Sequence, residues 1–183
     1  MKAYSEEELA RLIRLSDPDE LWDIYDAEGR KTGRVQRRGD PFAEGDRHLC
    51  VHIWIRNSRG EYLLTKRAPE KSMAGLWECT GGSALLGEDS LTAALREVRE
   101  ETGLRLDPGA GRLLFRFSGD HYLCDTWVFC REIDLGEIVL RPGETVDKRL
   151  ADADTIRALN AAGAFFAFED LERVLDMSVE SGV

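Results

Sequence analysis

The feature that most constrains this chain is a helix predicted in its middle, over about residues 89–102. Leu91, Leu95 and Val98 recur at the i, i+4 and i+7 spacing of a helix face that packs against a core. Gly103 follows the last turn, where a helix C-cap glycine is expected. A helix with one apolar face has to bury that face against another layer, so we expect a layered domain.

The polar side of the same helix carries Glu97, Glu100 and Glu101. Positions three and four apart share a helix face, so the three carboxylates are expected to converge near its C-terminal end. Anions are disfavoured at that end by a few tenths to about 1 kcal/mol each. Two interpretations are open from these residues alone. One is a solvated acidic face balanced by Arg96 and Arg99; the other is a site for a hard cation such as Mg²⁺, which binds carboxylates together with substrate phosphates.

The wider spacing separates these interpretations. The stretch 82–104 resembles the signature motif of the Nudix hydrolases, G-x5-E-x7-R-E-U-x-E-E-x-G-U with U aliphatic, at all nine specified positions. A chance match is on the order of one in a billion per starting position. The residues at these positions are Gly82, Glu88, Arg96, Glu97, Val98, Glu100, Glu101, Gly103 and Leu104.

The resemblance implies both a fold and a reaction. The expected fold is a Nudix-type α/β/α sandwich of the α/β (α+β) class, with a mixed β-sheet and the motif as loop–helix–loop. The implied reaction is hydrolysis of a diphosphate linkage in a nucleoside diphosphate bound to another moiety, X, with Mg²⁺ or Mn²⁺ as cofactor. Glu97, Glu100 and Glu101 match the family's metal-binding glutamates, and Gly82 would let a backbone carbonyl approach the metal.

Other roles follow from the same resemblance. Glu100 is our candidate general base and Arg96 is expected to orient a carboxylate. Glu88 is expected to brace the loop or to bind an outer metal through water. The family often has a further acid in the loop before the C-terminal helices; Glu144 is the candidate here, but no tryptophan or phenylalanine follows it in residues 141–152. The base therefore remains open at this point.

Basic and aromatic residues near the motif have two interpretations each. Arg67 and Lys71 are expected to bind the diphosphate, although a charged edge strand with a solvated loop would also carry such residues. Trp77 is the best candidate for stacking on a base, although aromatic residues in predicted strands more often lie in a core.

The N-terminal half is also similar to isopentenyl-diphosphate isomerases, through WDIYD, GRKTGR, HLCVHIWIRNSRGEYLLTKRAPEK and GLW. That branch has a catalytic cysteine roughly where Gly82 stands here. Cys79 lies three residues earlier, which places it on the opposite face of a strand. His48 matches a metal-binding histidine of the branch. The missing nucleophile favours hydrolysis. An isomerase-like enzyme and a catalytically silent nucleotide-sensing module remain the alternatives.

Composition and charge indicate the domain organisation, the partners and the location to expect. The chain has 183 residues, 43% hydrophobic and 33% charged, with a formal net charge of −10. These values favour a single globular domain over 1–183, with an N-terminal extension at 1–46 and a catalytic core at 47–178. Such acidity argues against duplex nucleic acid as a partner and leaves a small-molecule diphosphate. We expect a cytoplasmic protein without a membrane segment, and a homodimer is possible through the N-terminal segment.

The remaining elements are predicted from periodicity, capping residues and turns. Helices are expected at about 6–14, 154–163 and 168–177. Residues 141–152 are expected to form a loop. Strands are expected in LWDIYD and RVQRR, in 48–57 and the following EYLLTKRA, in 76–82, and in RLLFRFSG and HYLCDTWVFCREI.

Overall fold

The computed structural model describes residues 19–166 and 171–180, and its centre is a seven-stranded mixed sheet. The strand order is β5-β4-β3-β8-β7, with β6 also paired to β3 and β9 to β4. β3 and β8 run parallel, and the other pairs are antiparallel. The strands are β3 (His48–Arg56), β4 (Tyr62–Arg67), β5 (Trp77–Glu78), β6 (Thr80–Ser83), β7 (Gly111–Ser118), β8 (Tyr122–Cys130) and β9 (Thr145–Ala151).

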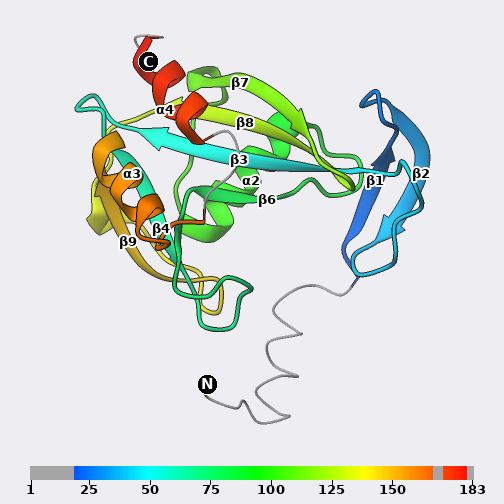
Figure 1. Cartoon of the computed structure of the whole chain (residues 1–183), viewed down its shortest axis with the longest axis horizontal. Coiled ribbons are helices and arrows are strands. Elements are labelled where there is room, and N and C mark those ends of the chain that lie inside the picture. The colour runs from blue at the N-terminus through cyan, green and yellow to red at the C-terminus, as the bar shows by residue number, and fades with distance from the viewer. Residues whose placement is uncertain (1–18, 167–170, 181–183) are drawn as a thin grey trace.

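Helices cover both faces of this sheet (Figure 1). On one face, α2 (Ser90–Thr102) buries Ala94 and Val98 against the β3 residues Val51 and Ile53. On the other face, α3 (Ala153–Ala161) and α4 (Leu171–Glu180) pack in a second apolar cluster that includes Trp54. Alternation along β3 explains both clusters, because successive side chains of a strand point to opposite faces. The predicted α/β/α sandwich with a mixed sheet is confirmed.

The N-terminal extension forms a separate two-stranded sheet from β1 (Leu21–Tyr25) and β2 (Lys31–Arg37). This hairpin packs on the main domain where Trp22 stacks on His48, with ring centroids 4.2 Å apart. The backbone N–H of Leu86 donates to the carbonyl of Leu21 at 2.7 Å. The two predicted strands are therefore confirmed, and the start of the hairpin lies beside the loop of the motif. The helix predicted at 6–14 lies outside the described residues.

Two predictions about strands were wrong. The expected loop at 141–152 contains β9, which pairs with the whole of β4. The sequence of β9 is mostly polar and does not predict a strand, because this strand forms through its pairing with β4 and not through an alternating pattern of its own. The single strand at 76–82 is two strands, because the chain crosses from β4 to β3 at Cys79. β4 is also not an edge strand, since β5 and β9 both pair with its residue Lys66.

Two short 3₁₀ turns, η1 (Pro108–Ala110) and η2 (Leu135–Glu137), complete the described elements. None of the helices in the described residues has the length and apolar character that crossing a membrane requires.

Candidate active site

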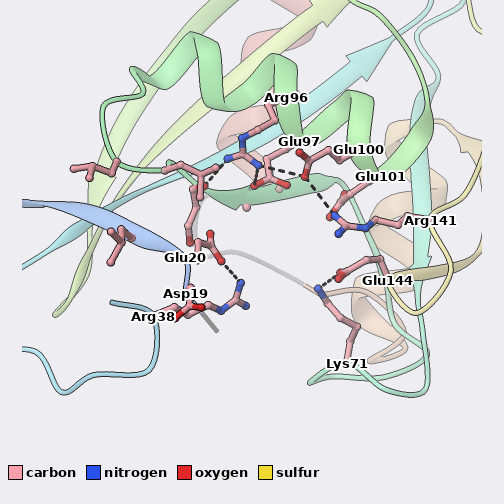
Figure 2. Close-up of a pocket in the computed structure, with 16 residues that line it drawn as sticks. Asp19, Glu20, Arg38, Lys71, Arg96, Glu97, Glu100, Glu101, Arg141 and Glu144 are labelled. Atoms are coloured by element: carbon pink, nitrogen blue, oxygen red, sulfur yellow. Dashed lines mark hydrogen bonds and ion pairs between the residues drawn. The ribbon is translucent and has the colours of Figure 1, made fainter. Parts of the chain in front are cut away.

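A pocket of about 530 Å³ opens where the hairpin, β6 and α2 meet. Its volume lies in the range of small-molecule sites. Figure 2 shows three groups of side chains around it: the motif residues of α2, then Lys71, Arg141 and Glu144 on one side, and Glu20 and Arg38 on the other. The pocket thus brings together residues from distant parts of the sequence around the predicted metal-binding glutamates.

The three glutamates of α2 differ in their exposure. The Glu97 side chain is 12% exposed and that of Glu100 is 40% exposed, while Glu101 as a residue is only 8% exposed. Burial raises the pKa of Glu97 to about 7, although Arg96 opposes the shift. Burial also raises the pKa of Glu101 well above its usual range, and the neighbouring charges of Glu97 and Glu78 add to this effect. Without a cation, two of the three therefore hold a negative charge poorly.

Arg96 ties the helix to the loop that precedes it. Its guanidinium donates to both oxygens of Glu88 at 2.8 and 3.0 Å and to the carbonyl of Ser83 at 2.8 Å. It also donates to Glu97 at 2.9 Å and to Glu100 at 3.4 Å. Glu88 in turn accepts from the backbone of the loop at Leu85. Burial alone would raise the pKa of Glu88, but the bonds from Arg96 and from that backbone N–H lower it. The first glutamate of the motif therefore braces the loop.

Gly82 has no room for a side chain, whereas its backbone conformation is one that any residue can adopt. It lies on β6 opposite Val51, outside the set of residues with positive φ. A Cβ atom at this position would collide with the carboxylate of Glu97. The absence of a side chain lets Glu97 rest against the backbone of β6. The Glu97 carboxylate and the backbone at Gly82 thus lie close together in the pocket lining.

The donor set of the pocket fits a hard divalent cation. One oxygen, Oε2 of Glu101, is buried and has no hydrogen-bond partner among the described residues. An unpartnered buried carboxylate oxygen is costly, and Mg²⁺ and Mn²⁺ prefer such oxygen ligands. In the described part of the chain, no three His, Cys, Asp or Glu side chains are already arranged as a coordination cage. Glu100 instead contacts Arg141 at 3.3 Å and Arg96. The case for a divalent cation therefore rests on the carboxylate oxygens that the pocket offers, and not on a preformed coordination geometry.

The two predicted diphosphate-binding cations lie in different places. Lys71 lines the pocket, where it forms an ion pair with Glu144. Arg67 forms a buried ion pair with Glu78 and donates to the carbonyl of Ser72 at 2.7 Å, and it is not among the described residues that line the pocket. Burial raises the pKa of Glu78 despite this partner. The structure thus brings Lys71, but not Arg67, to the glutamates.

Sequence reasoning missed several residues of the pocket. Arg141 lies in the stretch that was expected to be a loop. It is three residues before Glu144, the candidate acid, and this proximity in the sequence could have identified it as a pocket residue. Glu20 and Arg38 flank the strands β1 and β2 of the hairpin, and nothing in the sequence shows that this hairpin docks beside the motif. Trp77 does not line the pocket; its ring packs under Lys66 of β4 and Arg149 of β9.

No cysteine lines the pocket, although all four lie in the described residues. Cys79 is buried in the cluster under α3 and α4, and burial raises its pKa well above the usual range. Burial also raises the pKa of Cys50 to about 12. His48 stacks on Trp22, and burial lowers its pKa to about 4. The thiols of Cys50 and Cys79 are therefore neutral, and no cysteine lines the pocket as the nucleophile of an isomerase would.

Comparison with known proteins agrees with this site. The NUDIX domain model matches residues 46–178. An uncharacterised Nudix hydrolase of Listeria monocytogenes is 31% identical over 160 residues, which cover 86% of this chain and 95% of the relative. An isopentenyl-diphosphate Delta-isomerase of Shigella flexneri is 32% identical over 87 residues, 46% of this chain and 48% of that protein.

A solved structure shows the same fold. The crystal structure of a Deinococcus radiodurans protein superposes with a TM-score of 0.71 at 24% identity, covering 86% of this chain and 98% of that chain. The chain belongs to the Nudix hydrolase family. Members of this family are generally pyrophosphohydrolases that use divalent metals such as Mg²⁺ or Mn²⁺ and act on small-molecule diphosphates.

Proposed function

We propose that this protein cleaves the diphosphate linkage of a small molecule of the nucleoside diphosphate–X type in the pocket beside α2. One observation carries the proposal: Glu101 is buried at the pocket beside Glu97, whose side chain is only 12% exposed, and one oxygen of Glu101 has no partner among the described residues. Buried carboxylates with raised pKa values are expensive in a purely structural role. They are explained if the pocket works with a bound cation.

In this proposal Glu97, Glu100 and Glu101, with the backbone at Gly82, hold Mg²⁺ or Mn²⁺. The metal supplies charge neutralisation at phosphoryl oxygens and lowers the pKa of a bound water. Arg96 fixes the orientation of Glu97 through their 2.9 Å bond. This arrangement holds the carboxylates in place before the substrate arrives, so less reorganisation is needed during the reaction.

The diphosphate needs cations besides the metal. Lys71 and Arg141 line the same side of the pocket, and both now neutralise carboxylates that face it, Glu144 and Glu100. A substrate phosphate can replace these partners, because a guanidinium or ammonium group binds phosphate oxygens equally well. Release of Glu100 from Arg141 would free its carboxylate. We assign the general base to Glu100 because, at 40% exposure, it is the most accessible of the three glutamates to water.

The alternatives have less support. An isomerase of the isopentenyl-diphosphate type needs a positioned acid or nucleophile, and the thiols of Cys50 and Cys79 are neutral and lie outside the pocket lining. A silent nucleotide sensor would not need the complete set of carboxylates around Arg96. Both remain outcomes that the following experiment can detect.

The test is a screen of nucleotide and isoprenoid diphosphates with and without Mg²⁺. For nucleoside diphosphate–X compounds, cleavage is read as phosphate released after alkaline phosphatase, which acts on the phosphomonoester products but not on a diphosphate esterified at both ends. For isoprenoid diphosphates, whose terminal phosphate that enzyme removes directly, phosphate is read without it. We expect metal-dependent cleavage that falls by at least about 100-fold in Glu100→Gln and Glu101→Gln. Glu137→Gln is the matched control, because Glu137 forms an exposed ion pair with Arg131 outside the pocket lining. Unchanged turnover in both pocket variants would contradict the proposal, as would saturable binding without turnover.

A further inference from the structure

The pocket has a second wall that does not belong to the motif. Glu20 and Arg38 lie across from Lys71 and Arg141, with the glutamates of α2 between the two sides (Figure 2). Both come from the hairpin, which forms its own sheet. We call Glu20 and Arg38 the hairpin wall. A diphosphate held between the metal-binding glutamates and Lys71 would leave this wall to face whatever group the diphosphate carries.

The hairpin wall is fixed before a ligand binds. Glu20 accepts one hydrogen bond from the indole of Trp22 at 3.2 Å and one from Arg38 at 2.6 Å. The backbone N–H of Arg38 also donates to the carbonyl of Glu20 at 2.8 Å. The hairpin is attached to the motif loop, because the N–H of Gly87 donates to Asp23 at 2.9 Å. Such preorganised side chains bind a ligand with little loss of conformational entropy.

The wall still has hydrogen-bonding capacity to offer. A carboxylate has about four acceptor sites and a guanidinium has five N–H donors. Glu20 uses one site on each oxygen, and the Arg38 guanidinium bonds only to Glu20 among the described residues. The Arg38 side chain is 45% exposed, so its other donors can be reached. Acceptors and donors therefore lie next to each other, which matches groups that both donate and accept.

Hydroxyl groups have this property. We propose that the hairpin wall binds the moiety X and that X is hydroxyl-rich, as a sugar or polyol is. The inference rests on the proposed function, since it assigns the substrate class of the same pocket. No aromatic side chain is among the described residues that line the pocket, so this part of the chain offers no stacking surface for a base. The apolar lining near the wall is limited to Leu21, Leu85 and Leu86.

An apolar X is disfavoured by the same residues. An alkyl or prenyl chain against the wall would cover Glu20 and Arg38 without giving their free sites any partners. A site built from hydrogen-bonding groups rejects a ligand that lacks them more strongly than an apolar pocket rejects an added hydroxyl. The hairpin wall should therefore discriminate between two diphosphates that differ only in the hydroxyl groups of X.

The experiment uses matched pairs of substrates and the full-length chain with Mg²⁺. UDP-glucose is compared with the cyclohexyl ester of UDP, and ADP-glucose with the cyclohexyl ester of ADP; isopentenyl diphosphate represents an apolar diphosphate without a nucleoside. We expect kcat/KM to be at least about 10-fold higher for the glucose member of a pair. Glu20→Gln and Arg38→Gln should each raise KM for that member about 10-fold with little change in kcat, and should change the cyclohexyl esters less than about 2-fold.

Arg30→Gln is the control, because Arg30 lies at the turn of the same hairpin in an exposed ion pair with Asp26. It should behave as the wild type with every substrate. If Glu20→Gln loosens the hairpin, seen as a lower unfolding temperature, Arg38→Lys provides the second variant, since it keeps the charge and loses the fork. Equal kcat/KM within the pairs, or a uniform loss with all substrates, would overturn the inference while leaving hydrolysis intact. Absence of any metal-dependent cleavage would instead contradict the proposed function itself.

Discussion

Replacing Gly82 with alanine tests the geometry of the metal site most directly, because the added methyl group falls on the carboxylate of Glu97. The collision involves the end of a side chain, so the fold can absorb it by turning Glu97 away. That movement breaks the 2.9 Å bond from Arg96 and displaces an oxygen that we propose as a metal ligand. A displacement of about 1 Å in a positioned group can cost about 100-fold in rate. We therefore expect kcat/KM to fall about 100-fold, or about 2.7 kcal/mol of transition-state stabilisation.

The assay compares kcat/KM at saturating Mg²⁺ with the thermal unfolding temperature of the same samples. Gly109→Ala is the control: Gly109 lies outside the positive-φ set, and its Cβ would meet only Asp107, at an ordinary 3.4 Å. Both variants should unfold within about 4 °C of the wild type, the shift that about 1 kcal/mol produces in a chain of this size. A folded Gly82→Ala protein with wild-type kcat/KM would refute the reasoning that the glycine is kept for the approach of Glu97.

Three further changes have defined outcomes. Mg²⁺ should bind more weakly as the pH falls below about 7, because burial raises the pKa of Glu97 to about 7 and a proton then competes with the cation for the carboxylate. Calorimetric titration with Mg²⁺ at about pH 6 and pH 8 would measure the two affinities, and equal affinities would contradict the prediction. Arg67→Met leaves Glu78 buried without its partner, so urea denaturation at pH 7 should show a loss of about 3–5 kcal/mol in unfolding free energy. Arg30→Met, which removes an exposed ion pair, is the control and should unfold as the wild type does. The pKa of Glu78 is raised in the folded state, so its charge becomes costly as the pH rises; the Arg67→Met loss should shrink at acidic pH, and a pH-independent loss would argue for a packing effect. Arg96→Lys keeps the charge but loses the fork that joins the helix to its preceding loop, and activity assays should show a loss of about 10- to 100-fold.

Local periodicity was enough to predict the elements that make the core. The alternation along 48–57 predicts β3, and the apolar stripe with its flanking caps predicts α2 to within a residue at its start. The failures concern strands that exist because of their neighbours. β9 reads TVDKRLA, a sequence without clear alternation, and it becomes a strand because it pairs along the whole of β4. Such pairing is a tertiary property, and single-chain periodicity does not contain it.

The same distinction applies to the candidate site. Glu97, Glu100 and Glu101 could be placed on one side of a helix because helical spacing is local. Arg67 could not be placed, because its contact with Glu78 depends on the pairing of β4 with β5. The contribution of the hairpin was equally out of reach, since its strands were predicted but its docking on the loop before α2 was not. Residues on the motif were therefore predictable, as were Lys71 and Glu144 beside it, and the pocket residues from the hairpin were not.

The charge balance of the pocket explains why acidic residues are tolerated at the unfavourable end of a helix dipole. Its described lining carries six carboxylates and four cations, which leave a formal charge of −2 when all are ionised. Arginine and lysine neutralise the reachable carboxylates, but they do not reach Oε2 of Glu101, which is buried and unpartnered. One divalent cation, bound as we propose, would cancel the remaining charge and give this oxygen a partner, so a single event would remove both costs. Under the proposed function, the stability lost by burying Glu101 is the cost of affinity for a cation, as expected of a functional site rather than of a solvated acidic surface.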